Sequence, residues 1–239
     1  MTDYGQLAGA IATWLAEYAA RAGAKGYVVG LSGGIDSATT AALCLEAVGK
    51  ETVGVLMPCH SQPEDARMAK FVAAALGLAT VTVDLAPVFD LFVEELPVPV
   101  SGLAQANIKP RLRMACLYAL AQARGYLVAG TGNKSELMVG YFTKYGDGGV
   151  DVEPLGALYK WQVRELAQVL GVPQAIIDRP PSAGLWADQT DEDEMGITYE
   201  TLDRVLAALE AGQTQGIEKS VLDKVRAMIK SSEHKRAMP

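Results

Sequence analysis

Short apolar runs and segments with a helical repeat of apolar residues alternate along the first half of the chain. Four short runs have the length, β-branched content and glycine or polar flanks of buried strands, and they lie at 27–31, 52–57, 79–83 and 126–129. In 38–48 and 63–76, apolar residues return every three or four positions, as on one face of a helix. The alternation predicts right-handed βαβ units around a parallel sheet.

Six further segments have the apolar spacing of amphipathic helices. They lie at 4–22, 87–95, 103–124, 161–170, 199–209 and 217–229. On the first of them, one stripe collects the large apolar residues Leu7, Ile11, Trp14, Leu15 and Tyr18. We expect this stripe to pack against the sheet or against a second subunit. We expect the helix predicted at 103–124 to begin or kink at Pro110, because proline disfavours helical backbone in the residue before it.

The first predicted strand stops at a short polar loop. Ser32, Gly33 and Gly34 follow the apolar run, Asp36 and Ser37 come next, and a helix follows. The unpaired N–H groups and positive dipole at the start of a helix favour an anion, and the glycines let the backbone close around it. An ordinary glycine turn between strand and helix is the alternative interpretation. The spelling Ser-Gly-Gly-x-Asp-Ser resembles the pyrophosphate loop of N-type ATP pyrophosphatases, which cleave ATP between its α and β phosphates. It is neither a Walker loop nor Gly-x-Gly-x-x-Gly, and it leaves the acceptor open.

The length and hydropathy of the chain indicate a single α/β domain. The 239 residues suit one domain, 1–239, with no linker. Half of them are hydrophobic, yet no stretch approaches the ~20 uninterrupted apolar residues of a membrane span. The N-terminus also lacks the pattern of a secretory signal. We therefore expect a cytoplasmic protein with no membrane partner.

Charge and cysteine content exclude several classes of site. A net charge of −7 opposes a broad phosphate-binding surface, so we expect no nucleic-acid partner and an anionic ligand held by a few local cations. Cys44, Cys59 and Cys116 are odd in number and far apart, which predicts neither a disulfide framework nor a zinc site. Cys59 stands beside His60, but adjacent residues rarely present the geometry of a nucleophile and its base.

A second strand end meets a long stretch of small and polar residues. The predicted strand at 126–129 runs directly into 130–136, and the segments 140–151 and 154–160 contain many Gly, Thr, Lys and Asp residues. So many residues of these types in a row cannot form core. The segments are either part of a site or an ordinary solvated loop.

Two charged stretches carry less functional signal. The acidic run at 188–194 is not an EF-hand, because Met195 occupies the third ligand position, and it predicts a solvated loop before the next helix. Arg111 and Arg113 are two positions apart, which is about 200° around a helix. At most one of them can serve a common ligand, and the other is expected to be a surface charge or a salt-bridge partner.

Five motifs in chain order give the sequence a specific resemblance. They are Ser-Gly-Gly-Ile-Asp-Ser, Asn-Ile-x-x-Arg-x-Arg-Met, Gly-Thr-Gly-Asn-Lys-Ser-Glu, Thr-Lys-Tyr-Gly-Asp-Gly and Pro-Ser-Ala. Together they resemble NAD synthetase of the ammonia-dependent type over nearly the whole chain. The runner-up is another adenylating amide or thiolation enzyme, such as the ATP-pyrophosphatase part of GMP synthetase or a transfer RNA modifier. A catalytically idle nucleotide sensor with this fold is the alternative from a different class, although it would need a damaged site.

The resemblance implies a fold and a reaction. The fold is a doubly wound, Rossmann-like α/β domain with a mainly parallel five-stranded sheet and helices on both faces, assembled as a two-fold homodimer. The reaction is the final step of NAD biosynthesis, in which the nicotinate carboxylate of deamido-NAD attacks the α-phosphate of ATP and pyrophosphate leaves. Ammonia then displaces AMP from the adenylate. Mg²⁺ is the implied cofactor and ATP is a co-substrate.

The same resemblance assigns roles to individual residues. The implied ATP contacts are Gly30, Leu31, Ser32, Gly33, Gly34, Ile35, Asp36, Ser37, Thr131, Lys160 and Ser182. Asp36 and Glu136 would bind magnesium, and Asp36 and Lys160 would be catalytic. The implied deamido-NAD contacts are Arg111, Lys144, Asp151, His234 and Lys235. Ser182 stands where the family commonly has threonine, and Pro110, where it often has alanine, bears on the reach of Arg111.

We expect the nitrogen donor to be free ammonia rather than glutamine. Glutamine hydrolysis requires an activated nucleophile, a base and an oxyanion site, which related enzymes carry on a separate domain. The mapped motifs run from residue 32 to Lys235, and only the first helix precedes them. Cys44 and Cys116 fall within predicted helices, and Cys59 has no evident orienting partner.

Overall fold

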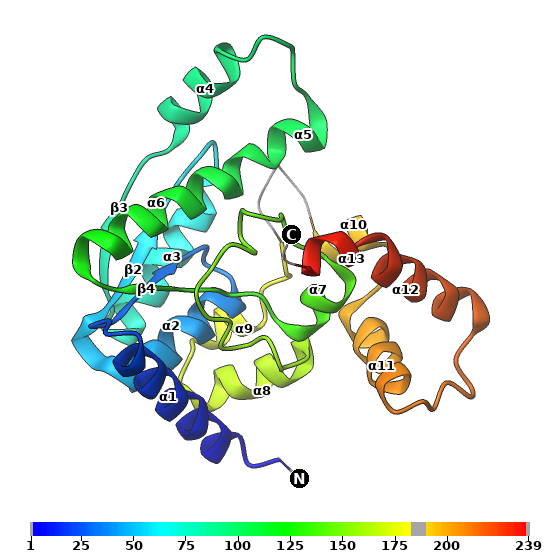
Figure 1. Cartoon of the computed structure of the whole chain (residues 1–239). Helices are drawn as coiled ribbons and strands as arrows, with labels where there is room; N and C mark the ends of the chain where they lie inside the picture. The colour runs from blue at the N-terminus through cyan, green and yellow to red at the C-terminus, as the bar shows by residue number, and fades with distance from the viewer. Residues whose placement is uncertain (1, 183–189, 238–239) are drawn as a thin grey trace.

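The computed structural model of the chain describes residues 2–182 and 190–237 (Figure 1). Its strands are β1 (Tyr27–Gly30), β2 (Thr52–Leu56), β3 (Ala79–Thr82) and β4 (Leu127–Ala129). The helices of the first half are α1 (Tyr4–Arg21), α2 (Ile35–Val48), the short 3₁₀ turn η1 (Gly49–Glu51), α3 (Pro63–Leu76), α4 (Ala86–Glu94), α5 (Gly102–Ala106) and α6 (Ile108–Arg124). Those of the second half are α7 (Lys134–Val139), α8 (Lys160–Val169), α9 (Gln174–Ile177), α10 (Asp191–Met195), α11 (Tyr199–Glu210), α12 (Lys219–Ser231) and α13 (Glu233–Arg236).

The sheet of the described residues has four parallel strands in the order β3-β2-β1-β4. The expectation of five strands is therefore wrong for this structure. At the fifth position, beside β4, there is only an isolated parallel bridge between Ala129 and Val152. The ladder stops there because the Val128 N–H donates to the Asp151 side chain at 2.8 Å instead of to a fifth strand. Pro154, just beyond the bridge, has no N–H to extend it.

Helices cover both faces of the sheet, as the doubly wound arrangement requires (Figure 1). Tyr27 and Val29 of β1 belong to a core cluster with α1, α2, α3 and α8, whereas Val28 belongs to a second cluster with α4 and α6. All three side chains are fully buried. Burial on both faces explains why the strands read as continuous apolar runs rather than as an alternating pattern.

Helix α1 packs against the core with most of the predicted stripe, because Leu15 is buried and Leu7, Ile11 and Tyr18 pack partly buried against the cluster beside β1. The buried residues are Ala8, Ala12, Leu15 and Ala19, whereas Trp14 remains 38% exposed. The Tyr27 hydroxyl donates to the Leu15 carbonyl at 2.7 Å, which ties α1 to β1. Alanine side chains at the other buried positions let α1 approach α2 and α8 closely.

The helix predicted at 103–124 is two helices, α5 and α6, that meet at Asn107. Pro110 thus lies in the first turn of α6, where its missing N–H has no intrahelical partner to lose.

A third cluster of buried residues, centred on Leu202, Val205 and Leu206, joins α11 and α12 to α7. Within 2–182 and 190–237, no helix combines the length and apolar character needed to cross a membrane.

Candidate active site

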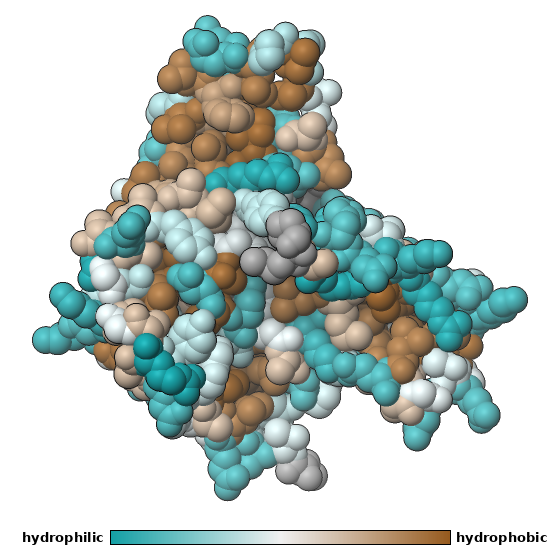
Figure 2. All heavy atoms as spheres, in the orientation of Figure 1, coloured by the Kyte–Doolittle hydropathy of each residue, from teal (hydrophilic) through white to brown (hydrophobic). Residues whose placement is uncertain are grey.

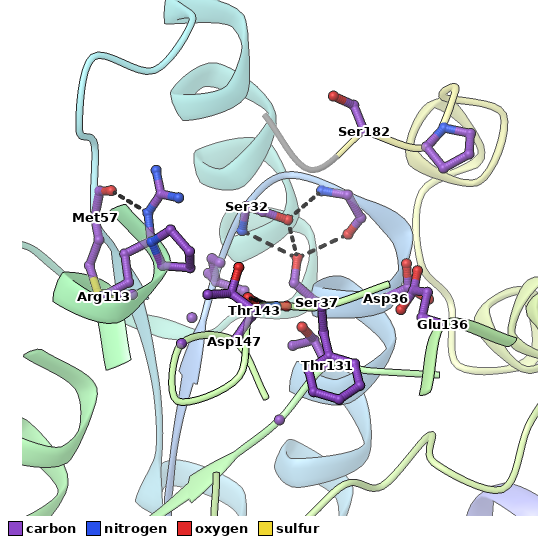
Figure 3. Close-up of a pocket in the computed structure, with 18 of the residues that line it drawn as sticks. Ser32, Asp36, Ser37, Met57, Arg113, Thr131, Glu136, Thr143, Asp147 and Ser182 are labelled. Carbon is purple, nitrogen blue, oxygen red and sulfur yellow. Dashed lines mark hydrogen bonds between the residues drawn. The ribbon is translucent and has the colours of Figure 1, made fainter. Parts of the chain in front are cut away.

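A cavity of about 400 Å³ opens at the carboxyl ends of β1, β2 and β4 (Figure 3). Gly30, Leu56 and Ala129, the last residues of these strands, all line it. Ligands of parallel α/β sheets bind at this edge, where the loops that follow the strands converge. Residues of both polar segments that follow strand ends, Ser32 after β1 and Thr131 after β4, line this cavity.

The loop after β1 is closed by its own hydroxyl groups. Gly34 N donates to Ser32 Oγ at 3.2 Å, and Ser32 N donates to Ser37 Oγ at 3.3 Å (Figure 3). Ser37 Oγ donates to the Gly34 carbonyl at 3.0 Å. Helix α2 starts at Ile35, three residues earlier than predicted, and its N-cap is Gly34, which has no side chain to satisfy the first N–H groups. The start of α2 therefore presents the features of an anion site.

Gly33 is required by space as well as by backbone geometry. Its φ is +82°, and a Cβ there would lie 2.8 Å from both the Asp65 carbonyl oxygen and Met68 Cβ of α3. Arg179 holds the same contact from the other side, donating to the Gly33 carbonyl at 3.2 Å and to Asp65 Oδ1 at 2.6 Å. Arg179 also lines the cavity, although no sequence motif pointed to it.

Two carboxylates and one lysine from three helices meet at one wall of the cavity. Lys160 Nζ, at the start of α8, lies 2.5 Å from Asp36 Oδ2 on α2 and 3.5 Å from Glu136 Oε1 on α7. The Lys160 side chain is only 2% exposed, and Asp36 and Glu136 are 18% and 14% exposed. Figure 3 shows Asp36 and Glu136 side by side. The structure thus brings together the residues predicted to bind metal and phosphate.

Burial and pairing shift the pKa values in this cluster. Burial raises the pKa of Glu136 to about 7, against the lowering effect of Lys160. Burial alone would lower the pKa of Lys160, but Asp36 and Glu136 outweigh it and the net shift is upward. Lys160 is therefore a permanent cation, held charged by the carboxylates it contacts.

Asn133 aligns the two carboxylates. Its Nδ2 donates to Asp36 Oδ1 at 3.1 Å, while its Oδ1 accepts from Glu136 N at 3.1 Å. Glu136 Oε2 accepts in return from Asn133 N at 3.2 Å, which completes a capping box at the start of α7. The spacing Asn-x-x-Glu is a sequence signal for this helix start, yet neither α7 nor the role of Asn133 was predicted.

Magnesium fits the donors that this cluster offers. Asp36 and Glu136 present carboxylate oxygens to one cavity from separate helices, and Lys160 neutralises one of their two charges when both are ionised. Among the described residues, no group of three or more His, Cys, Asp or Glu side chains is arranged to hold a metal. The remaining ligands would be phosphate and water oxygens, a coordination that Mg²⁺ favours.

Asp191 belongs to the site despite the prediction of a solvated loop. It begins α10, is 4% exposed and lines the cavity. The Tyr199 hydroxyl lies between the carboxylates, 2.8 Å from Glu136 Oε1 and 3.1 Å from Asp191 Oδ2. Only the fold reveals this, since an acidic run in the sequence is typical of an exposed surface.

Most residues predicted to contact ATP do line the cavity. They are Gly30, Leu31, Ser32, Gly34, Ile35, Asp36, Ser37, Thr131, Lys160 and Ser182. Gly33 instead lies against α3, beneath the loop. Thr131 follows β4, so the two strand ends contribute to the same cavity wall.

The predicted dinucleotide contacts divide into three groups. Lys235 lines the cavity and donates to the carbonyls of Gly140 and Phe142 at 2.8 and 3.0 Å. Arg111, Lys144 and His234 form a chain outside its lining, in which Arg111 Nη2 lies 3.4 Å from the Lys144 carbonyl and Lys144 Nζ lies 2.6 Å from the His234 carbonyl. Asp151 lies apart from both groups.

The two oxygens of the Asp151 carboxylate are bonded to the body of the fold. Oδ2 accepts from Val128 N, and Oδ1 accepts from the Tyr118 hydroxyl of α6 at 3.1 Å. In this structure Asp151 therefore joins β4 to α6. Its role as a substrate contact stays a prediction.

Arg113 is the arginine of the pair that lines the cavity. With Arg111 as the implied ligand contact, Arg113 was expected to be a surface charge or a salt-bridge partner, and the surface alternative is wrong. Arg113 Nε donates to the Met57 carbonyl at 3.2 Å (Figure 3). Its Nη2 donates to Ser61 Oγ at 3.2 Å. Burial lowers the pKa of its guanidinium. The opposite directions of Arg111 and Arg113 agree with their predicted separation around α6.

Asp147 is a further cavity residue that no prediction named. Its Oδ1 accepts from Thr143 N at 3.0 Å, and its side chain lines the cavity. It belongs to the Thr-Lys-Tyr-Gly-Asp-Gly motif, so the motif marked the segment without identifying the side chain.

Cys59 has the environment of a structural thiol. Its side chain is fully buried, and burial raises its pKa, which disfavours the nucleophilic thiolate. His60 pairs with Asp90 instead, at 2.7 Å. The pair Cys59 and His60 thus offers no activated nucleophile.

Glu153 is expected to contribute to a dependence of stability on pH. Its Oε2 accepts from Gly132 N at 3.0 Å, and burial raises its pKa from 4.5 to about 8. The folded form therefore holds a proton that the unfolded form releases, so stability falls as pH rises from about 4.5 to about 8. Glu153→Gln should flatten this slope in denaturant unfolding across that range. Parallel curves for variant and parent would contradict it.

Comparisons with known proteins point to one family. The family model described as NAD synthase matches residues 7–239. The NH3-dependent NAD+ synthetase of Carboxydothermus hydrogenoformans is 46% identical over 233 residues, which are 96% of this chain and 93% of the relative. The solved NMN synthetase of Francisella tularensis has a TM-score of 0.93 and 36% identity, covering 100% of this chain and 98% of that one. The NH3-dependent NAD synthetase of Campylobacter jejuni has a TM-score of 0.87 and 28% identity, with the same coverage.

Proposed function

This chain belongs to the NAD synthase family, and from that premise we infer that it is an enzyme that uses ATP and ammonia to amidate deamido-NAD to NAD. The observation that carries the inference is the Asp36, Lys160 and Glu136 cluster beside the loop after β1. A damaged nucleotide sensor would not need these three groups intact and converging. The dinucleotide contacts and the metal belong to the same proposal.

The chemistry requires alignment and charge neutralisation rather than a protein nucleophile. A carboxylate is a poor electrophile, so the nicotinate group must first gain a better leaving group by attacking the α-phosphate of ATP. Pyrophosphate departs, and ammonia then attacks the adenylate and releases AMP. Oriented N–H groups and fixed cations stabilise the charge that develops on phosphate oxygens.

We assign the leaving pyrophosphate to the loop at Ser32–Gly34 and the start of α2. The N–H groups there need acceptors, and the hydroxyls of Ser32 and Ser37 hold the loop in shape. Lys160 would supply a fixed positive charge, because its pKa is raised. Mg²⁺ held by Asp36 and Glu136 would screen the phosphate charges when bound.

For the dinucleotide we propose Arg111, Lys144 and His234 beside Lys235. The hydrogen bonds that join the first three hold the positive charges of Arg111 and Lys144 close together on the exposed surface. Arg111→Ala should raise the KM for deamido-NAD about tenfold, the effect of losing one charged hydrogen bond. Arg113→Ala should act mainly on the KM for ATP, because Arg113 contacts the end of β2 inside the cavity. Steady-state kinetics with each substrate varied would contradict the proposal if Arg111→Ala changed only the KM for ATP.

The proposed homodimer would cover the projecting arm formed by α4, α5 and the segment between them. Hydrophobic residues predominate along this arm, below a tip that also carries hydrophilic residues (Figure 2). Its exposed apolar residues are Val88, Leu91, Phe92, Val98 and Leu103, which are 48% to 61% exposed. A patch of this kind on a water-facing arm favours association with a second copy. Sedimentation of the purified protein tests this, and Leu91→Asp with Phe92→Asp should yield monomers.

The activity is tested by measuring NAD formed from deamido-NAD and ATP, with ammonium chloride or ammonia-free glutamine as nitrogen source. We expect NAD only with ammonium, and faster turnover as pH rises from about 7 toward 9, because free ammonia is the nucleophile. Pyrophosphate release must depend on deamido-NAD. Comparable turnover with glutamine would contradict the assignment of the nitrogen donor.

A second candidate substrate is the corresponding mononucleotide. The NMN synthetase of Francisella tularensis matches with a TM-score of 0.93, above the 0.87 of the Campylobacter NAD synthetase. The curated relative at 46% identity favours the dinucleotide. A comparison of kcat/KM for deamido-NAD and nicotinic acid mononucleotide decides between them, and we expect the dinucleotide to be preferred.

Two broader expectations complete the proposal. We propose that residues 1–239 act as one domain, which limited proteolysis would contradict by releasing stable fragments. We also propose a cytoplasmic location, in keeping with the three free cysteines of the structure. Cell fractionation with an antibody tests the location.

A further inference from the structure

Asp203 is a buried carboxylate that does not line the cavity but lies against the two helices that carry Lys160 and Glu136. It belongs to α11 and is 3% exposed. A carboxylate is rarely buried to this extent unless hydrogen bonds compensate its charge. Its partners therefore indicate what the residue does.

The partners of Asp203 are the first turns of α7 and α8. Ser135 Oγ donates to one carboxylate oxygen, and Trp161 N donates to the other at 3.1 Å. Ser135 Oγ accepts in turn from Lys160 N at 3.0 Å. The first two N–H groups of α8 are thus satisfied by Ser135 and Asp203, two residues distant in sequence, in the way that an N-cap satisfies a helix start.

This chain of hydrogen bonds connects the helix starts that carry Glu136 and Lys160. Ser135 directly precedes Glu136 on α7, and Lys160 is the first residue of α8. Ser135 is fully buried and Lys160 is 2% exposed, so no water competes for these bonds. The contact between Ser135 Oγ and Lys160 N fixes the spacing of the two helix starts. That spacing sets where Lys160 Nζ lies relative to Glu136.

We propose that Asp203, acting through Ser135, is a positioning residue that fixes Lys160 and Glu136 in their reactive arrangement. The proposal rests on the function proposed above, in which Lys160 and Glu136 serve the reaction. Asp203 itself touches neither substrate nor metal. Displacement of a reacting group by about 1 Å can cost about 10²-fold in rate, so loosening these helix starts should act on kcat.

Glu210, seven residues later on α11, provides a matched control. Its carboxylate accepts from Lys134 Nζ at 2.6 Å and from the Tyr159 hydroxyl, so it joins the same three segments. Its side chain is 44% exposed, and it lies outside the cavity lining. An ion pair this exposed contributes little to stability. These bonds of Glu210 come from side chains and not from the backbone of Lys160.

The experiment compares Asp203→Ala, Asp203→Asn, Ser135→Ala and Glu210→Ala in the full chain. We expect Asp203→Ala and Ser135→Ala to lower kcat per folded molecule about 30- to 100-fold, with the KM for ATP changed less than about threefold. Asp203→Asn should recover part of the rate, because its amide oxygen can still accept from Trp161 N. Glu210→Ala should keep kcat within about threefold. The double variant of Ser135 and Asp203 should lose no more than the worse single variant, because both act through one chain of bonds.

A purely structural role would lower the thermal midpoint and leave kcat per folded molecule unchanged, which would overturn the proposal. If the fold-losses in kcat of the two single variants multiply in the double variant, Asp203 does not act through Ser135. If Asp203→Ala does not fold, Ser135→Ala and Asp203→Asn carry the test, because each conserves the local volume more closely. Lys160→Met separates the two inferences. If Lys160→Met is fully active, the proposed function of this site is wrong. If Lys160→Met is inactive while Ser135→Ala and Asp203→Asn are fully active, only the positioning role is wrong.

Discussion

Lys160→Met should lower kcat by about 10³-fold, because it removes the fixed cation of the site. In the parent protein Lys160 Nζ lies 2.5 Å from Asp36 and 3.5 Å from Glu136. Methionine keeps much of the side-chain volume but leaves both carboxylates without their cation. Turnover at saturating ATP, deamido-NAD and magnesium measures the loss.

The same substitution should also destabilise the protein, by about 3–5 kcal/mol at most, as expected when a buried ion pair loses one partner. Proton uptake by Glu136, whose pKa is already raised to about 7, limits this cost at low pH. Loss of Lys160 raises that pKa further, so the variant should become less stable relative to the parent as pH rises. Denaturant unfolding at several pH values measures this.

Lys134→Met is the control for Lys160→Met. Lys134 starts α7, and its Nζ lies 2.6 Å from Glu210, but its side chain is 23% exposed and outside the cavity lining. Its loss should leave kcat within about threefold, in line with the small contribution of exposed ion pairs. A kcat of Lys160→Met within tenfold of the parent, measured on folded protein, would show that Lys160 is not the catalytic cation.

Asp36→Asn and Glu136→Gln should each lower kcat by at least about 10²-fold and raise the magnesium concentration needed for half-maximal rate. Each change conserves shape and removes one negative charge from the proposed metal site. The fold should persist, because Lys160 still pairs with the remaining carboxylate. A magnesium titration of the initial rate separates lost metal binding from lost alignment.

Glu153→Gln is the matched control for the metal prediction. Glu153 is also a carboxylate near the residues after β4, where it accepts from Gly132 N, but it does not line the cavity. Its variant should keep the magnesium dependence of the parent. If Glu136→Gln and Asp36→Asn also kept that dependence, these carboxylates would not be the metal ligands.

The local features of the site could be predicted because they arise from neighbouring residues. The apolar run of β1, the glycines after it and the start of α2 are contiguous, so backbone sterics and the helix dipole indicate an anion loop from the sequence. The same holds for the polar residues after β4. Parallel strands place their carboxyl ends at one edge of the sheet, and both loops line the cavity there.

Other features depended on distances that sequence patterns do not contain. Lys160 and Asp36 are 124 positions apart, and their contact follows from how α8 packs on α2. Asp191 was predicted to be solvated because its neighbours are acidic, yet α10 and Tyr199 enclose it. Helix spacing left one arginine of the pair as a surface charge or a salt-bridge partner, whereas Arg113 lines the cavity and contacts Met57 and Ser61.

The sheet and α1 illustrate the same limit within the fold. A fifth strand was expected from the family resemblance, but one hydrogen bond from Val128 N to Asp151 ends the ladder at a single bridge. The period of α1 predicted its helix and most of its packed stripe, whereas the contact with α2 and α8 decided that alanines take most of the fully buried positions. Periodicity depends on neighbours within a few residues and can be read along the chain. Burial and pairing depend on which distant segments meet, and only the packed structure decides that.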